Sequence, residues 1–118
     1  MEEILQPWLH SSRLVLLWPT RGVQNASVKA RMDDMSEIAD NIKVLGTISK
    51  GTIEFDAYAA RTAAAAIADS AALIPTLFKT KETDAESEAK SIIWENFEDC
   101  SSKAAELEVI SENCLSCL

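Results

Sequence analysis

The clearest apolar pattern in the chain lies between residues 27 and 50. Apolar side chains recur there at spacings of three and four, the interval of one helix face; they are Met35, Ile38, Ile42, Leu45 and Ile48. Ser27 suits an N-cap, and Gly51 follows the pattern. The pattern therefore predicts a helix over about Ser27–Lys50.

An alanine-rich stretch follows and predicts a second helix, because alanine has the highest helix propensity of all residues. Asp56 can cap its start. Pro75 is expected to end it at about Ile74, since proline disfavours a helical residue before it.

Thr83 and Glu86 have the spacing of a capping box, which marks a helix start. They predict a third helix over about Ala85–Ser111, with an apolar stripe of Ile93, Phe97, Cys100, Ala104, Leu107 and Ile110. Residues 1–26 show no clear period. Three helices joined by short loops predict an all-α, up-and-down helix bundle that forms a single domain over residues 1–118.

Length and charge narrow the range of functions. The 118 residues suffice for one domain with its own core, and they carry a net charge of −8. The first 50 residues hold equal numbers of acidic and basic side chains, so the excess negative charge follows Lys50. A surface of that sign repels phosphate backbones, and we expect no nucleic-acid partner. No apolar run is long enough to span a membrane, and the acidic Glu2 and Glu3 are unlike the start of an export signal.

Two cysteines three residues apart, Cys114 and Cys117, are the strongest candidates for chemistry. Their spacing suits a redox pair, part of a zinc site, a simple disulfide or pair of idle thiols, or covalent haem attachment through C-x-x-C-H. The redox pair needs an α/β unit and the zinc site needs two more ligands at a suitable spacing, and neither is evident. In the haem motif a histidine follows the second cysteine, whereas here Leu118 occupies that position.

Enzymatic activity is not expected. His10 is the one histidine in the sequence and has no nearby carboxylate partner for a catalytic triad. There is no phosphate-binding loop, dinucleotide fingerprint or metalloprotease motif. The carboxylates of the third predicted helix follow its polar side, which is typical of a solvated face.

An ordered series of short motifs resembles the cytochrome c-prime family, including its low-spin, methionine-ligated relatives. The series runs from about Ala30 to Leu107, roughly two-thirds of the chain. Its members are Arg31-x-x-x-Met35, Val44-Leu45-Gly46, Lys50-Gly51, Phe55-Asp56, Leu73-Ile74-Pro75-Thr76-Leu77-Phe78, Glu86-Ser87-Glu88-Ala89-Lys90 and Ile93-Trp94. Each piece is common alone, and their order makes the series specific.

The resemblance implies a four-helix bundle that binds a c-type haem (haem c) near one end and is located in the periplasm. Such proteins transfer electrons to a redox partner protein or bind a small gaseous ligand, and a homo-oligomer is expected. Carried over to this sequence, Cys114 and Cys117 would form the thioethers to the haem. Arg31 would lie near a haem propionate, and Met35 would be the distal iron ligand.

Three features depart from the family pattern. Leu118 replaces the proximal histidine, the span between Leu107 and Cys114 is too short for most of a fourth helix, and residues 1–26 have no match. We expect the fourth helix to be shortened or replaced by the N-terminal segment, whose apolar side chains would cover an exposed stripe; they are Trp8, Leu9, Leu14, Leu16, Leu17 and Trp18. The alternative function is a haem-free helical remnant that self-associates through that stripe.

Overall fold

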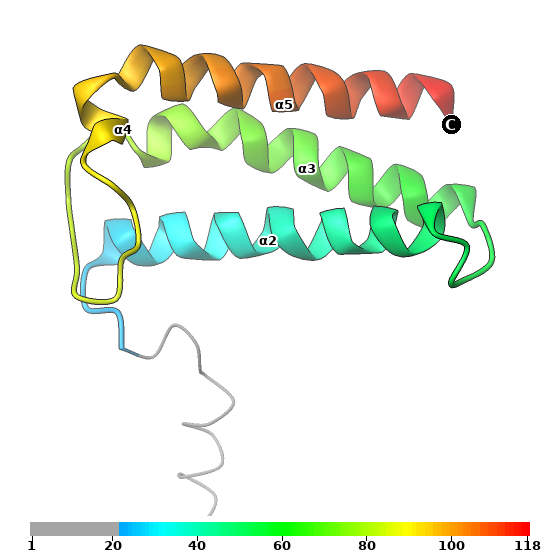
Figure 1. Ribbon diagram of the computed structural model, residues 1–118, viewed down its shortest axis with the longest axis horizontal. Coiled ribbons are helices and arrows are strands. Elements are labelled where there is room, and N and C mark those ends of the chain that lie inside the picture. Colours follow the sequence, from blue (N-terminus) through cyan, green and yellow to red (C-terminus); the bar gives the residue numbers. More distant parts are fainter. Residues whose placement is uncertain (1–21) are drawn as a thin grey trace, which may run out of the picture.

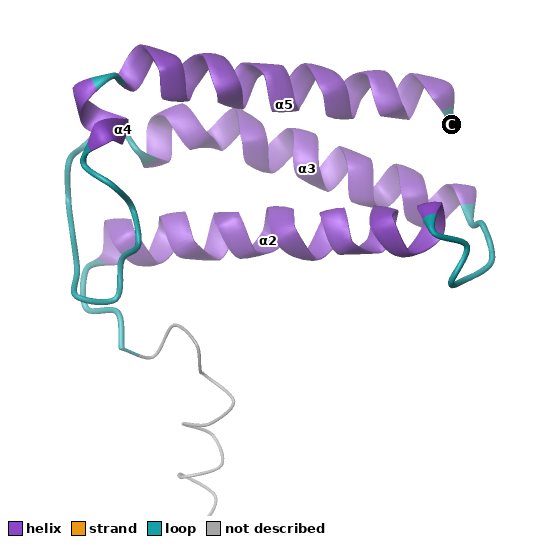
Figure 2. Ribbon diagram, in the orientation of Figure 1, coloured by secondary structure: helices purple, strands orange, loops and turns teal. Residues whose placement is uncertain are grey.

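The computed structural model describes residues 22–118, and all the regular structure in that range is helical. Figure 1 shows three long helices side by side: α2 (Ala26–Ser49), α3 (Ala57–Leu77) and α5 (Phe97–Cys117), with the one-turn helix α4 (Ile92–Glu95) before α5. Loops join successive long helices at alternating ends (Figure 2). The predicted all-α, up-and-down architecture is therefore confirmed. The N-terminal segment that we expect to replace a fourth helix lies mostly outside the described residues.

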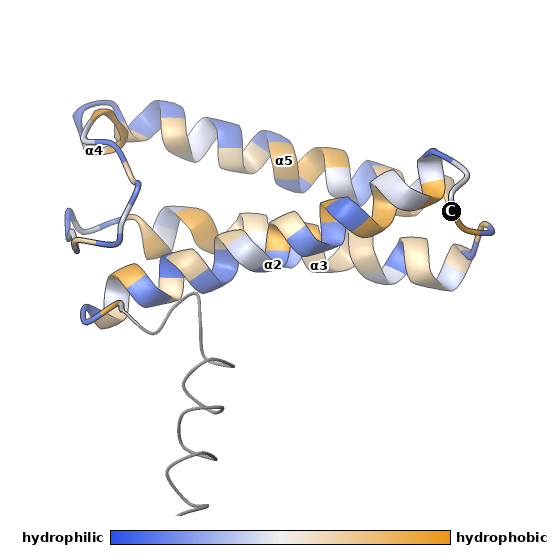
Figure 3. Cartoon of the chain, turned by 60° about the horizontal axis from the view of Figure 1, so that its bottom comes forward, coloured by the Kyte–Doolittle hydropathy of each residue, from blue (hydrophilic) through white to orange (hydrophobic). Residues whose placement is uncertain are grey.

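Helix α3 is the central element. It packs against both α2 and α5, whereas the backbones of α2 and α5 do not approach each other closely in the described part of the chain. Most of the buried side chains of α3 are alanines, and small side chains allow two helices to approach a third closely; the buried set is Ala60, Ala63, Ala64, Ile67, Ala68, Ser70 and Ala71. In the turned view of Figure 3 the N-terminal halves of α2 and α5 stand apart. Three helices in this arrangement leave one corner of a four-helix bundle open.

The first helix begins one residue earlier than predicted. Its N-cap is Asn25 rather than Ser27, because the Asn25 Oδ1 atom accepts a hydrogen bond of 3.1 Å from the backbone N–H of Val28. The predicted C-terminus is confirmed within a residue. Gly51 follows it with a φ of 71°, a left-handed conformation that glycine adopts without strain.

The second helix starts as predicted and ends later. The Asp56 side chain accepts hydrogen bonds from the backbone N–H groups of Tyr58 and Ala59, at 2.9 and 3.2 Å. The prediction that Pro75 ends the helix is wrong, because α3 continues to Leu77. A proline in the last turn removes only one backbone hydrogen bond, and the helix then closes through a 3.0 Å bond from Phe78 N–H to the Ile74 carbonyl.

The predicted third helix over Ala85–Ser111 is wrong at both ends. Asp84 binds the backbone N–H of Glu86 through Oδ1, at 3.1 Å, and those of Gln24 and Asn25 through Oδ2, at 2.9 and 3.0 Å. These bonds hold residues 84–86 in a turn tied to the start of α2, so helix begins only at Ile92. At the other end α5 continues without a break to Cys117.

None of the described helices combines the length and hydropathy needed to cross a membrane.

Candidate functional site

The open side between α2 and α5 forms an apolar groove above α3, which we call the α2–α5 groove. Two adjoining pockets of about 450 and 610 Å³ occupy it, and both are lined by Met35, Phe78 and Ile93. Cys100 and Leu107 of α5 complete the wall of the first pocket. Volumes of this size are typical of small-molecule and cofactor sites.

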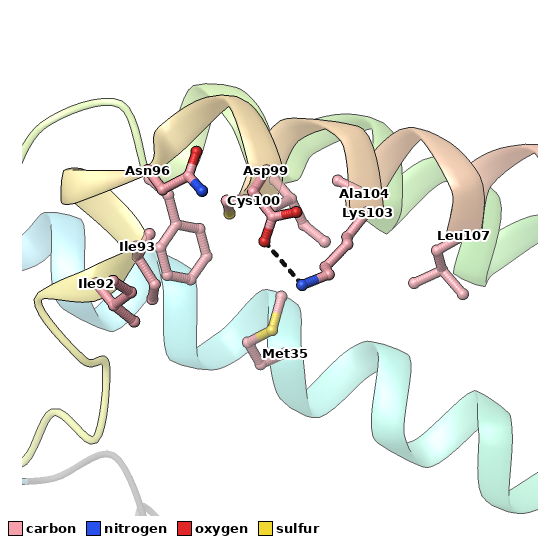
Figure 4. Close-up of a pocket in the computed structure, with 11 residues that line it drawn as sticks. Met35, Ile92, Ile93, Asn96, Asp99, Cys100, Lys103, Ala104 and Leu107 are labelled. Atoms are coloured by element: carbon pink, nitrogen blue, oxygen red, sulfur yellow. Dashed lines mark hydrogen bonds and ion pairs between the residues drawn. The ribbon is translucent and has the colours of Figure 1, made fainter.

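Met35 lies at the centre of the groove and remains 37% exposed. Figure 4 shows its side chain directed from α2 toward the face of α5 that carries Cys100, Lys103 and Leu107. Lys103 forms an ion pair of 2.7 Å with Asp99 at the rim, and this hydrogen bond to the carboxylate raises the pKa of Lys103. The groove therefore presents one soft thioether in an apolar setting, with paired charges at its edge.

Cys100 is the cysteine whose side chain reaches this pocket. Burial raises the pKa of its thiol, and the neighbouring Asp99 carboxylate acts in the same direction. A thiol with a raised pKa stays protonated at neutral pH and reacts slowly. Cys100 therefore contributes apolar lining to the groove in the described structure.

Arg31 is almost completely buried, with 2% of its surface exposed. Its Nε donates to the carbonyl oxygen of Leu77 at 2.8 Å, its Nη1 to that of Glu82 at 2.7 Å, and its Nη2 to that of Thr80. The guanidinium carbon also lies 5.2 Å from the ring centroids of both Phe78 and Trp94. One side chain thus ties α2 to the segment after α3.

This placement differs from the haem-propionate contact expected for Arg31. Its guanidinium is enclosed by two aromatic rings and three carbonyl groups. Arg31 instead fixes the segment that carries Phe78, a wall of the groove. The Trp94 Nε1 group strengthens the same cluster by donating to the Phe78 carbonyl at 2.7 Å.

Cys114 and Cys117 lie in the last turn of α5, beside the C-terminus marked in Figure 1. They follow Cys100 by 14 and 17 residues on one continuous helix, which corresponds to about 21 and 26 Å at 1.5 Å per residue. Leu107, which also lines the Met35 pocket, precedes the two cysteines by seven and ten residues, so they lie about 10 and 15 Å beyond that end of the pocket along α5. The structure therefore brings Arg31 and Met35 together in the second pocket and leaves Cys114 and Cys117 outside it.

The other uses considered for the cysteines gain no support from residues 22–118. All three cysteines are free thiols, so Cys114 and Cys117 form no disulfide. No group of three or more His, Cys, Asp or Glu side chains in this range is arranged to hold a metal ion.

One polar contact between α2 and α3 gave no signal in the sequence. Asp34 of α2 faces Ser70 of α3, and the Asp34 Oδ2 atom is buried without a hydrogen-bond partner. Burial raises the pKa of the Asp34 carboxyl group, and the Ser70 hydroxyl offsets part of that rise. This carboxylate lies in the interface that supports Met35.

The described residues meet part of what a c-type haem requires. The α2–α5 groove supplies an apolar cavity, and Met35 supplies a thioether of the kind that ligates haem iron. Arg31 lines the second pocket beside Met35, but its guanidinium donates to three backbone carbonyl groups, and Cys114 and Cys117 line neither pocket. The fit thus rests on Met35 and the groove.

Comparisons with known proteins agree with the motif series. A family model described as Cytochrome C' matches residues 26–115. The chain is similar to cytochrome c-556 of Agrobacterium tumefaciens strain apple 185, at 37% identity over 74% of this chain and 69% of the relative. The protein of the same name from strain II Chrys is 35% identical, over 77% and 74% of the two chains.

A third relative, cytochrome c-556 of Agrobacterium fabrum, is 38% identical over 68% of this chain and 54% of its own length. No solved structure matches the chain significantly. The family match covers α2, α3, α4 and nearly all of α5, and haem c is the cofactor that the family implies. The chain belongs to the cytochrome c-prime family.

Proposed function

We propose that the protein is an electron carrier whose c-type haem lies against the α2–α5 groove at Met35. The observation that carries this proposal is the position of Met35, a partly exposed thioether at the centre of an apolar cavity between two helices whose backbones do not approach each other closely. A bound haem supplies a one-electron redox centre. A periplasmic location is part of the proposal.

The protein's own residues would set the properties of that centre. Met35 offers a sulfur lone pair to the iron, and a thioether ligand raises the reduction potential. Phe78, Ile93 and Leu107 exclude water from that side of the groove. The net charge of −8 favours docking of a basic redox partner, since complementary charge speeds encounter.

The cysteine assignment places the covalent attachment beyond the groove. Cys114 and Cys117 follow Leu107, the last residue of α5 that lines the Met35 pocket, by seven and ten residues, which is about 10 and 15 Å along the helix. Neither cysteine lines either pocket, so a haem joined to this pair would have to extend along α5 to reach Met35. We propose that Met35 is the iron ligand.

The test is to express the full chain with haem-attachment machinery and compare Met35→Leu with the neighbouring Met32→Leu. Met32 lines the second pocket only, so it is a matched control. We expect Met35→Leu to change the visible spectrum and to lower the reduction potential, with Met32→Leu close to the unsubstituted protein. Equal spectra and potentials for all three proteins would contradict ligation by Met35.

Gas binding is the finer alternative at the same place. A diatomic ligand such as carbon monoxide would compete with Met35 for the iron, so Met35→Ala is expected to bind it faster than the unsubstituted protein does. An equal rate of carbon monoxide binding in Met35→Ala and the unsubstituted protein would contradict ligation of the iron by Met35.

The second candidate is a haem-free helical protein that self-associates. Two observations favour it: Leu118 occupies the position of the expected proximal histidine, and the Cys114–Cys117 pair does not meet Met35. A colourless protein of bare polypeptide mass that elutes as an oligomer would support this candidate over the electron carrier.

A further inference from the structure

We infer that the outward face of α5 is a docking surface for a basic helix of a partner protein. This surface lies on the side of α5 away from α3 and is separate from the α2–α5 groove. The view that the partner is a redox protein rests on the proposed function, whereas the surface itself does not depend on haem. Three features support it: the exposure of α5, a hollow on its outward face, and the placement of its carboxylates.

Helix α5 is an edge element in the described part of the chain. It packs against α3 and the one-turn helix α4, and Figure 1 shows it at the border of the molecule. Its buried residues are Ala104 and Ser111, which lie seven positions apart and therefore on one face. Away from that face, Val109 is 53% exposed and Ile110 is 65% exposed. Residues 22–118 leave these apolar side chains without a cover.

A hollow of about 440 Å³ lies on the outward face of α5. It is lined by Ser102, Ala105, Glu106, Val109 and Ile110, and none of them lines either pocket of the α2–α5 groove. The small side chains of Ser102 and Ala105 leave space beside Val109. One apolar side chain of a partner can therefore be buried there, which is favourable because it removes apolar surface from water.

Carboxylates stand at both ends of this hollow. Five residues form one line along α5, since their spacings of four and three return to the same helix face; they are Glu98, Ser102, Ala105, Val109 and Glu112. Glu98 and Glu112 each lie seven residues from Ala105, which is about 10 Å along the helix axis. The outward face thus has an apolar centre between two negative charges.

The charge of α5 favours a basic partner over a second copy of this chain. The helix has five acidic residues and one basic residue, Lys103, which is already paired with Asp99 at 2.7 Å. Among the described residues, neither Glu98 nor Glu112 takes part in an ion pair. Two such helices would repel each other, whereas lysine or arginine side chains of a partner would be attracted to both ends of the hollow.

The spacing of the two carboxylates defines the pattern of the partner helix. A helix that lies along α5 with an apolar residue in the hollow brings its positions seven residues before and after that residue level with Glu98 and Glu112. Seven residues make two helical turns, so these three partner positions share one face. The partner is therefore expected to carry lysine or arginine, six residues, an apolar residue, six residues, and lysine or arginine.

Fluorescence anisotropy with the full chain tests this pattern. The probe is a labelled synthetic helix of alanine and glutamine with a central leucine and a lysine seven residues to either side of it. The control peptide has the same composition, with the lysines moved to five residues on either side. We expect the probe to bind about fivefold more tightly than the control peptide at low salt, and to bind more weakly as salt is added. Equal binding of the two peptides, or no binding, would overturn the inference.

Matched substitutions locate the binding surface. Val109→Asn and Glu112→Gln should each weaken binding of the probe about threefold, because they remove the apolar wall and one carboxylate. Their controls are Leu73→Asn, at an apolar residue of α3 that is 52% exposed, and Asp40→Asn, at an exposed carboxylate of α2. We expect both controls to bind like the unsubstituted protein. Equal losses in Glu112→Gln and Asp40→Asn would show that net charge alone attracts the probe and would also overturn the inference.

The absorption spectrum of the same preparation separates this inference from the proposed function. A colourless chain that binds the probe at α5 would contradict the electron-carrier function and support the docking surface. A haem-loaded chain that does not bind the probe would contradict the docking surface alone.

Discussion

Replacing Arg31 tests how the groove is held in place, because this one side chain joins α2 to the segment that forms a wall of the groove. Arg31→Ala removes three hydrogen bonds from a charged donor to the carbonyl groups of Leu77, Thr80 and Glu82. It also removes the contact of the guanidinium with two aromatic rings. Three backbone carbonyl groups would lose their partner.

The magnitude follows from these contacts. A hydrogen bond from a charged group contributes about 1.5–3 kcal/mol, and a partly desolvated cation–π contact contributes about 0.5–2 kcal/mol. These contributions are not additive, and water can enter the loop after truncation, so we expect a loss of about 4 kcal/mol in the free energy of unfolding. A domain of this size has about 5–15 kcal/mol in total, so Arg31→Ala would be near the limit of folding.

Urea unfolding followed by far-ultraviolet circular dichroism measures this loss. Arg31→Lys keeps the charge but not the planar fork of donors, and its expected loss is smaller, about 2 kcal/mol. Arg61→Ala is the matched control, because Arg61 is exposed and donates one hydrogen bond, to the Leu118 carbonyl oxygen. We expect it to cost less than about 0.5 kcal/mol. An Arg31→Ala protein as stable as Arg61→Ala would refute the structural role given to Arg31.

Three further predictions concern α2, α3 and α5. Because burial raises the folded-state pKa of Asp34 above its unfolded value, ionisation of Asp34 costs stability, and that cost disappears as the pH falls through the raised pKa. Asp34→Asn should therefore be more stable than the unsubstituted protein at pH 7 and lose that advantage in acid; a constant difference across the pH range would contradict this. Asp56→Ala should lose about 1 kcal/mol in urea unfolding, because two N-terminal N–H groups of α3 lose their acceptor; an unchanged midpoint would disprove the cap. Iodoacetamide at pH 8 should modify the exposed Cys117 before Cys100, because burial raises the pKa of the Cys100 thiol. Peptide mass analysis over time measures the order of modification, and the reverse order would show that Cys100 is not protected.

The helix pattern predicted the architecture because each long helix has its own local signals. The start of α3 depends on Asp56 alone, and the apolar stripe of α2 is continuous from Met35 to Ile48. The start of the third helix failed for the opposite reason. The Asp84 side chain accepts hydrogen bonds from backbone groups 60 and 59 positions earlier in the chain, and no helix begins at this point. A local sequence pattern cannot reveal partners so far away.

The candidate site was predicted only in part. Met35 was found through the motif series, and the structure places it in the groove. The burial of Arg31 was not predicted, because its three carbonyl partners lie in a loop whose path the sequence does not specify. The separation of Cys114 from Met35 follows from the fact that α5 continues unbroken to Cys117. The prediction ended this helix at Ser111 and therefore did not place Cys114 on it.

The absorption spectrum of the purified full chain, combined with its intact mass under denaturing conditions, tests the central claim most directly. After expression with haem-attachment machinery, the account predicts a haem absorption band, a mass increase of one haem, and a spectrum that changes on Met35→Leu. A colourless protein at the bare polypeptide mass would contradict the electron-carrier function. A haem band that is lost in Cys114→Ser with Cys117→Ser but is unaffected by Met35→Leu would contradict the placement of the haem at the α2–α5 groove.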